Sequence, residues 1–226
     1  MLIFIPKQSM TKKLLLILGL TTLLALITVT AVYSQDVVVF KHTNYTTHFS
    51  KSLKYPVLVE WWITKAKVGC PTPLARVDAF QPDPQDMELT DIKKDYVGSG
   101  FDRGHNMPAA ENQCQSMDVQ IECFYMSNMT PQYHSLNAGD WKSLETWERQ
   151  TANELDSVHV WCGSVGEVKR IGKVAVPKTC WKVVYINKTK EYLAYIFENV
   201  ADKPTGLNSH KVTVADVEKL SGFKFK

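Results

Sequence analysis

The stretch YVGSGFDRGHNMPAAENQ, residues 96–113, concentrates polar chemistry in a short space. An acid, a guanidinium, a glycine and an imidazole follow one another as Asp102, Arg103, Gly104 and His105. His105 can take up a proton near neutral pH, and Arg103 offers a planar fork of donors suited to phosphate or carboxylate oxygens. The stretch therefore predicts a site for an anionic substrate. For these four residues alone, the alternative is a salt-bridged turn with a buried histidine.

Two downstream segments complete an ordered set of motifs. Residues 124–132 have the sequence FYMSNMTPQ, and residues 136–149 have the sequence LNAGDWKSLETWER. Together with SGFDRGHNMPAAENQ, residues 99–113, they closely resemble the DNA/RNA non-specific endonucleases, the sugar-non-specific nucleases of the ββα-metal (His-Me finger) type. The resemblance covers roughly residues 61–226. It implies an α+β fold, a central antiparallel sheet flanked by helices, with a ββα-metal active-site unit.

The local pattern around the motifs predicts such a β-β-α unit. We expect a short strand at residues 124–126, paired with the strand that ends near His105, and a turn at residues 128–132. From Leu136 polar residues recur at three- and four-residue intervals, which indicates a helix. This helix carries Asn137 near its start and Glu145 two turns later.

The resemblance also implies a reaction, the hydrolysis of phosphodiester bonds in DNA and RNA with little sequence preference and with 5′-phosphate products. His105 would be the general base that activates water. Asn137 would be the direct protein ligand of a divalent ion, magnesium, with manganese as a substitute. Glu145 would hold metal-bound water. Three arginines would contact phosphate oxygens: Arg76, Arg103 and Arg149.

Each of these roles has a structural alternative. The alternatives are a satisfied structural histidine for His105, a helix cap for Asn137 and an exposed loop residue for Arg76. Glu145 and Arg149 stand four residues apart, so an ordinary helix salt bridge is a further interpretation, and it is compatible with function. The alternative function is a catalytically inactive nucleic-acid or polyanion binding module on the same scaffold. The chain has no nucleophile-elbow sequence, which disfavours a serine hydrolase.

Residues 1–35 have the composition of an export signal. They contain no acidic residue, three lysines and an apolar run from Leu14 to Val32. This pattern predicts a signal peptide over residues 1–35, a single nuclease domain over residues 36–226, and a secreted or periplasmic protein. The apolar run is long enough that an uncleaved membrane anchor is the alternative. Nothing in the sequence selects an oligomeric state or an inhibitor protein as partner.

The total charge of the chain says little about its partners, but the positions of its arginines are informative. The 226 residues include 26 basic and 23 acidic side chains, and the three lysines of the leader account for the whole excess. The remainder is neutral, so bulk charge does not indicate nucleic acid. Only four of the basic residues are arginines, however, and three of these are the predicted phosphate contacts. A chain that uses lysine elsewhere reserves arginine for bidentate oxyanion contacts.

Five cysteines fit an oxidising compartment and leave one thiol without a partner. We expect a bridge from Cys114 to Cys123, which would close a short loop after the histidine segment. A second pairing, Cys162 with Cys180, is the weaker expectation. The alternative for each cysteine is a small buried side chain.

The rest of the chain predicts a sheet and a final helix. Short apolar runs bounded by turn residues indicate strands, and a helix with Gly222 just beyond it is expected near the end. The expected strands are residues 37–40, 57–62, 158–165, 174–176, 181–186 and 192–197, of which the last four are expected to form the central sheet.

Overall fold

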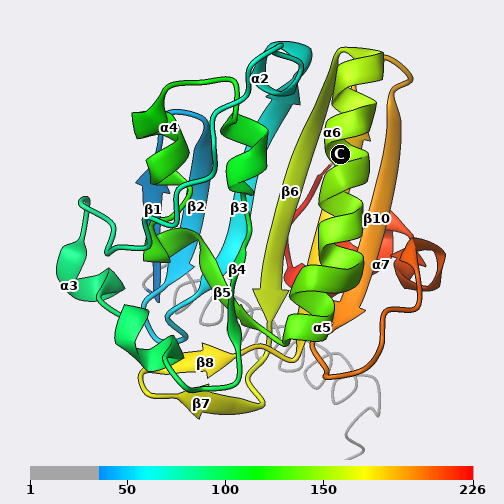
Figure 1. Ribbon diagram of the computed structural model, residues 1–226. Coiled ribbons are helices and arrows are strands. Elements are labelled where there is room, and N and C mark those ends of the chain that lie inside the picture. Colours follow the sequence, from blue (N-terminus) through cyan, green and yellow to red (C-terminus); the bar gives the residue numbers. More distant parts are fainter. Residues whose placement is uncertain (1–35, 226) are drawn as a thin grey trace, which may run out of the picture. The chain divides into compact units, whose positions relative to one another are not determined.

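The apolar runs of the sequence assemble into one large sheet. The structure, a computed structural model, describes residues 36–225, and Figure 1 shows their arrangement. All recorded strand pairs from β2 onward are antiparallel, which confirms the expected α+β class. In spatial order the strands are β1 (Val37–Lys41), β2 (Tyr45–Ser50), β3 (Pro56–Thr64), β6 (Ser157–Val165), β9 (Thr179–Ile186), β10 (Glu191–Glu198) and β11 (Lys211–Val212).

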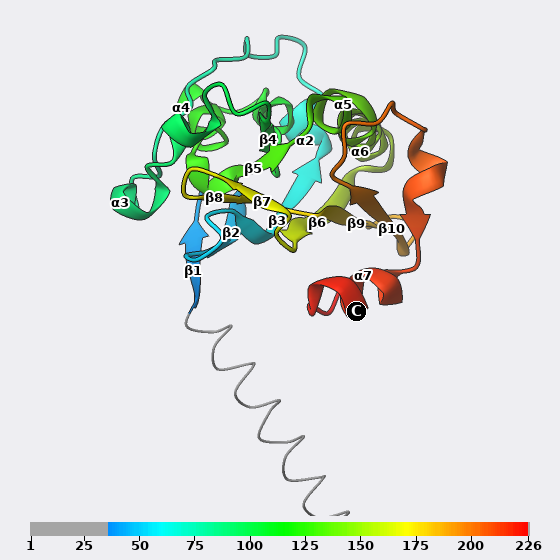
Figure 2. The same cartoon turned by 90° about the horizontal axis from the view of Figure 1, so that it is seen from below.

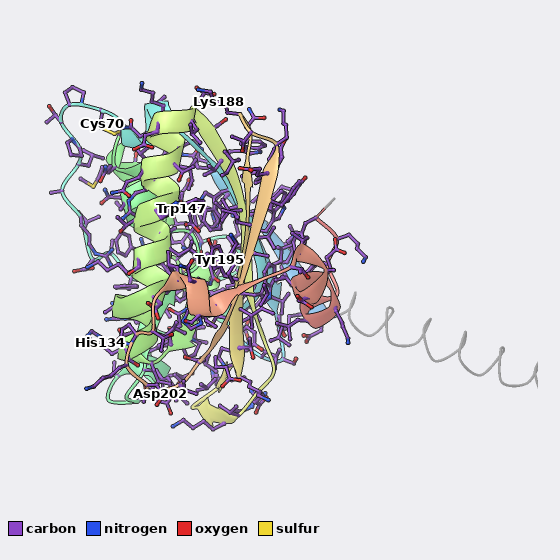
Figure 3. The ribbon with its side chains drawn as sticks, turned by 90° about the vertical axis from the view of Figure 1, so that its right-hand side faces the viewer. Cys70, His134, Trp147, Lys188, Tyr195 and Asp202 are labelled. Atoms are coloured by element: carbon purple, nitrogen blue, oxygen red, sulfur yellow. A yellow bond between two sulfur atoms is a disulfide. The ribbon has the colours of Figure 1, made fainter. Side chains whose placement is uncertain are left out.

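Two helices cover opposite faces of this sheet: α6 (Lys142–Leu155) and α7 (Val214–Ser221) (Figures 2 and 3). Successive residues of a strand point to opposite faces. Trp181 and Val183 of β9 accordingly pack in one cluster with Val217 of α7. Val184, the next residue, lies in another cluster with Leu144 of α6. The sheet thus separates two apolar layers.

The helix that carries the predicted site residues starts earlier than expected and is interrupted. It begins with α5 (His134–Leu136), continues through a π-helical turn, η4 (Asn137–Trp141), and then becomes α6. Gly139 has non-helical backbone angles within this turn, φ −100° and ψ −114°. A Cβ at Gly139 would lie 2.6 Å from Cγ of Pro204, so the loop at Pro204 can pack there only against glycine.

The strand that pairs with the DRGH segment differs from the expected one. β4 (Asp102–His105) pairs antiparallel with β5 (Met129–Gln132), and His105 lies opposite Met129. Residues 124–126 are not a strand, and residues 129–132 are the strand rather than a turn. The apolar run at Phe124 suggested a strand, but Phe124 is a core residue of an irregular segment. Pro131 argued against a strand at residues 129–132, since proline is tolerated only at edges and bulges.

A second small sheet corrects another expectation. β7 (Lys169–Ile171) and β8 (Val174–Val176) pair with each other and lie outside the central sheet. Apolar content predicts a strand but not the sheet it joins. The remaining helical elements are short: α2 (Lys65–Val68), α3 (Met87–Thr90), α4 (Met117–Glu122), η1 (Lys93–Tyr96), η2 (Ala109–Asn112), η3 (Met126–Asn128) and η5 (Leu207–His210).

The cysteine pairing expected from the sequence is wrong. The disulfide joins Cys70 to Cys114, while Cys123, Cys162 and Cys180 are buried free thiols. Cys114 lies beside α2, because its backbone N–H donates to the carbonyl oxygen of Lys67 at 3.3 Å, and Cys70 follows shortly after the end of α2. Cys123 is closer to Cys114 along the chain, but the fold brings Cys70 next to Cys114.

The predicted signal peptide, residues 1–35, lies outside the described residues. Contacts group the chain from Val38 onward into one compact unit. Among residues 36–225, no helix is both long enough and apolar enough to cross a membrane.

Candidate active site

His105 ends β4 and is buried, with 8% of its surface exposed. Its ring packs against Phe80 and Phe124 at centroid distances of 5.5 and 5.0 Å. Burial, followed by the positive charges of Arg76 and Arg103, lowers the pKa of His105 to about 3. The imidazole is therefore neutral at neutral pH, and its Nε2 has no hydrogen-bond partner among the described residues. A neutral imidazole of this kind is able to accept a proton.

Two of the predicted arginines rest on the same aromatic pair as His105. The guanidinium carbon of Arg103 lies 4.1 Å from the ring centroid of Phe80, and that of Arg76 lies 4.9 Å from the centroid of Phe124. Contacts of this kind combine ring stacking with cation–π attraction. The side chain of Arg76 is 54% exposed, as the loop alternative requires, and its Nε lies 3.1 Å from Oδ1 of Asp78, yet its charge acts on His105. The structure thus brings Arg76, Arg103 and His105 together.

Asp102 connects this strand to the helix. Its Oδ2 accepts a hydrogen bond from Nδ2 of Asn137 at 2.8 Å, and Nδ1 of His134 lies at the same distance. His134, which no sequence motif marked, is thus a second partner of Asp102. Asn137 lies within the helical run and makes no side-chain cap, so the capping alternative is not observed.

A second bond fixes the helix to the strand that carries the histidine. The indole Nε1 of Trp141 donates to the carbonyl oxygen of His105 at 3.1 Å, and both residues are buried. The bonds from Trp141 and Asn137 attach both ends of the π turn to β4. The histidine strand and the first turn of the helix therefore lie side by side, as Figure 2 shows for β4, α5 and α6.

Glu145 and Arg149 lie one turn apart on α6 and do not pair. Arg149 donates from Nη2 to Oγ1 of Thr146 at 3.0 Å, and it has no carboxylate partner within 4.0 Å in the described part of the chain. Burial raises the pKa of Glu145 to about 7, while the positive charge of Lys182 opposes this shift. The salt-bridge alternative is thus not observed.

Three further buried ionisable side chains lie beneath these residues and were not predicted: Glu111, Glu148 and Lys182. Lys182 and Glu148 form an ion pair of 3.2 Å with neither side chain exposed. Glu111 accepts a hydrogen bond from the indole of Trp61. The sequence did carry a signal for Lys182, because it interrupts an apolar strand at a position that alternation places toward α6.

The residues present fit a hard divalent ion with few protein ligands. Among residues 36–225 there is no group of three or more His, Cys, Asp or Glu side chains that could hold a metal. The amide of Asn137 turns its nitrogen to Asp102 and leaves its oxygen as the free donor atom. A single carboxamide oxygen suits magnesium, which prefers oxygen ligands and keeps several waters.

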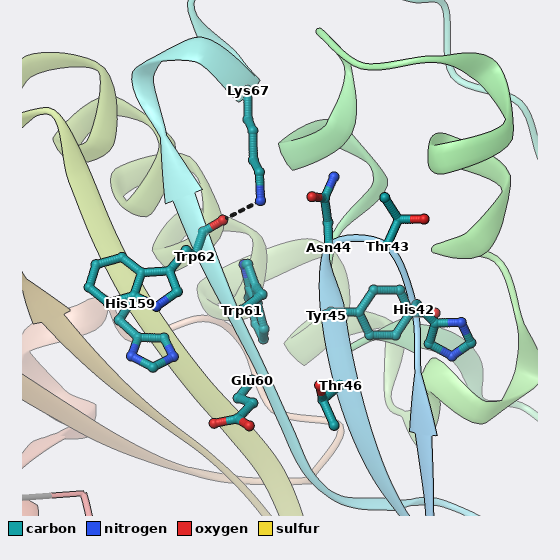
Figure 4. A pocket seen from close by; sticks show the side chains of 10 residues that line it. All are labelled: His42, Thr43, Asn44, Tyr45, Thr46, Glu60, Trp61, Trp62, Lys67 and His159. Atoms are coloured by element: carbon teal, nitrogen blue, oxygen red, sulfur yellow. Dashed lines mark hydrogen bonds between the residues drawn. The ribbon is translucent and has the colours of Figure 1, made fainter.

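A cavity of about 390 Å³ lies elsewhere, over β2, β3 and β6. Its lining includes Asn44, Trp62, Lys67 and His159 (Figure 4). None of the six predicted site residues lines it. The candidate active site is therefore the region around β4 and the start of α6, not this cavity.

The fold and the site define an α+β protein in which a histidine and two arginines lie together at a strand that is bonded to the start of a helix. The model of the family described as DNA/RNA non-specific endonuclease matches residues 25–226. The chain therefore belongs to the DNA/RNA non-specific endonuclease family.

Individual proteins agree with this assignment. The chain is 30% identical to the mitochondrial nuclease EXOG of Homo sapiens over 206 residues, which cover 81% of this chain and 55% of that protein. It is 30% identical to a nuclease of Serratia marcescens over 207 residues, which cover 84% of this chain and 74% of that protein. The chain spans about half the length of the EXOG relatives it matches.

A solved structure shares the fold. It is a complex of EndoG with EndoGI, described as showing the mechanism of EndoG inhibition. The two chains superimpose with a TM-score of 0.73 at 23% identity, covering 83% of this chain and 84% of the other.

Proposed function

We propose that this protein is a divalent-metal-dependent endonuclease that hydrolyses phosphodiester bonds in DNA and RNA with little sequence preference. Membership of the family supports this function. The observation that carries it is the arrangement around His105: a neutral imidazole flanked by Arg76 and Arg103 and connected through Asp102 to Asn137.

In the proposed reaction His105 acts as general base. Its neutral imidazole takes a proton from a water molecule as the water oxygen bonds to phosphorus and the bond from phosphorus to the 3′ oxygen breaks. The leaving 3′ oxygen takes a proton from solvent water, so the products are a 5′-phosphate and a 3′-hydroxyl end, and His105 later releases its proton to solvent. The negative charge of the bound phosphate offsets the two arginines that depress the pKa of His105, so substrate binding makes the base stronger.

The arginines bind the substrate and stabilise the transition state. Arg76, Arg103 and Arg149 would contact non-bridging phosphate oxygens, where charge accumulates as the water attacks. Contacts to phosphate carry no base information, which accounts for weak sequence preference. The three arginines also supply positive charge locally, in a domain whose total charge is neutral.

The oxygen of Asn137 would hold the metal, with magnesium as the ion and manganese as a substitute. Glu145 would hold a metal-bound water through a hydrogen bond. When bound, the ion supplies positive charge beside the scissile phosphate and the leaving oxygen. Asp102 fixes the amide in the orientation that this role requires.

We also propose that the protein is exported, to a secreted or periplasmic location, because the leader has the composition of a signal peptide. An inhibitor protein is a candidate partner, since the structural relative EndoG was solved with EndoGI.

The function is tested by incubating the purified domain with supercoiled plasmid and with RNA, with and without a chelator. We expect both substrates to be cut, no cutting in chelator, and recovery on adding magnesium or manganese. Binding of plasmid without any cutting would instead support the catalytically inactive module, and cutting that survives the chelator would overturn metal dependence.

A further inference from the structure

Lys182 occupies an unusual position for a lysine, on the α6 side of the central sheet with no exposed surface. A buried ammonium is costly unless it is paired and hydrogen-bonded. Its partner is Glu148 of α6, whose Oε2 lies 3.2 Å from Nζ. Glu148 is also fully buried. Neither residue is among the predicted catalytic or binding residues.

Lys182 also contacts the residue that joins the helix to the histidine strand. Its Nζ lies 4.4 Å from the ring centroid of Trp141, and the indole of Trp141 donates to the carbonyl oxygen of His105. Lys182 is therefore next to the helix turn that precedes Glu145 and one contact away from His105.

Three carboxyl groups meet in this region. Glu111, Glu145 and Glu148 influence one another electrostatically, and the cations that oppose their charge are Lys182 and Arg149, with Arg76 acting on Glu145 as well. The second carboxylate oxygen of Glu148, Oε1, has no hydrogen-bond partner among the described residues. The same is true of Nη1 of Arg149, although this nitrogen is buried.

Arg149 is therefore an unpaired cation next to an acid-rich cluster. Arg149 is adjacent in sequence to Glu148, yet Glu148 pairs with Lys182 and not with Arg149. If Lys182 were absent, Glu148 would be a buried carboxylate without a counter-ion, and a buried unpaired charge strongly favours any cation that can reach it. Besides Lys182, Arg149 is the cation whose charge acts on both Glu111 and Glu145.

We propose that Lys182 is a positioning residue for the nuclease site: by pairing with Glu148 beneath α6, it keeps Arg149 unpaired and available to a phosphate oxygen. This inference rests on the proposed function, because it assigns the phosphate contact to Arg149. Lys182 itself does not touch the substrate.

The test measures plasmid cleavage by wild type, Lys182→Met, Lys182→Met/Glu148→Gln and Arg149→Ala. We expect Lys182→Met to lower kcat/KM by roughly tenfold or more. The share of this loss that falls on kcat, and the share that falls on KM, should match those of Arg149→Ala. The double variant removes the competing carboxylate along with the lysine, so its kcat/KM returns to within about threefold of wild type.

A further variant separates positioning from a general loss of packing. Adding Lys182→Met to Arg149→Ala should change kcat/KM by less than about twofold, because the contact that Lys182 protects is already gone. A purely structural role predicts that the two losses multiply, and that result would overturn the proposal. So would a Lys182→Met protein that cleaves as well as wild type.

Two further results would also be informative: a Lys182→Met protein that does not fold, and a wild-type protein that does not cut nucleic acid. If Lys182→Met does not fold, the double variant decides, since recovery to near wild-type cleavage supports the proposal and a loss of roughly a hundredfold opposes it. If wild type itself cuts no nucleic acid, the proposed function fails, whereas equal cleavage by wild type and Lys182→Met contradicts only the role of Lys182.

Discussion

Asp102 on β4 accepts a hydrogen bond from the amide nitrogen of Asn137, 2.8 Å away at the start of the π turn. This bond orients the carboxamide, because an amide whose nitrogen is held by a carboxylate must present its oxygen elsewhere. An acidic residue within the DRGH motif thus determines how the predicted metal ligand is presented. Replacing an outer group of this kind typically lowers metal affinity by roughly 10- to 100-fold.

Replacing Asp102 by alanine should therefore weaken metal binding without removing the ligand. We expect Asp102→Ala to raise the magnesium concentration for half-maximal cleavage by roughly 10- to 100-fold. The matched control is His134→Ala, which removes the other partner of Asp102 but leaves the bond to Asn137. His134→Ala should need the same magnesium concentration as wild type, and equal shifts in both variants would contradict an orienting role for Asp102.

Replacing His105 by alanine should nearly abolish plasmid nicking. General-base catalysis contributes roughly 10²- to 10⁴-fold to rate, so we expect a loss in this range with binding of plasmid retained. His48→Ala serves as control, because His48 lies on β2 and its ring faces Phe223 rather than the site. A circular-dichroism spectrum like that of wild type would show that the domain is folded, and unchanged nicking in His105→Ala would remove the mechanism.

That the histidine strand and the helix lie together was more predictable than the strand pairing around them. Ordered polar motifs marked Arg103, His105 and Asn137 in the sequence, and the structure joins their two segments through Asp102 and Asn137. Strand partners are not marked in this way: β5 contains Pro131 and lacks an apolar alternation, while the apolar run before it at Phe124 is core without being strand. Sequence pattern reports burial more directly than it reports pairing.

Contacts between distant segments were the part that could not be predicted. The disulfide joins residues 44 positions apart, and no spacing rule distinguishes Cys70 from Cys123 as the partner of Cys114. Lys182 and Glu148 are separated by 34 positions. Their pairing requires knowledge of which strand lies beneath α6, and only the register of the sheet provides it.

The Cys70–Cys114 bridge should stabilise the domain and hold the loop that carries Arg76. Removing it with Cys70→Ala/Cys114→Ala should lower the free energy of unfolding by about 2–4 kcal/mol, since the bridge closes a long loop. Urea unfolding of the oxidised proteins measures this difference. A reducing agent should destabilise wild type and leave the double variant unchanged, and a peptide map showing Cys114 joined to Cys123 would contradict the pairing.

The raised pKa of Glu145 predicts a dependence of stability on pH. Burial lifts its pKa from an ordinary value of 4.5 to about 7 in the folded protein, so between these values the folded state binds the proton more tightly than the unfolded state. This contribution is fully present below pH 4.5 and is lost as the pH rises through 7. Glu145→Gln cannot ionise and is free of this loss.

The comparison is urea unfolding of wild type and Glu145→Gln at pH 5 and pH 8 without added metal. We expect Glu145→Gln to gain stability relative to wild type by on the order of 2 kcal/mol between the two pH values. His105 titrates in both proteins, and its lowered pKa makes both more stable as the pH rises from 3 toward 6.5, so its effect cancels in the difference. A difference that stays constant with pH would show that Glu145 is ionised throughout, and its carboxylate would then be ready to hold a metal-bound water even at pH 5.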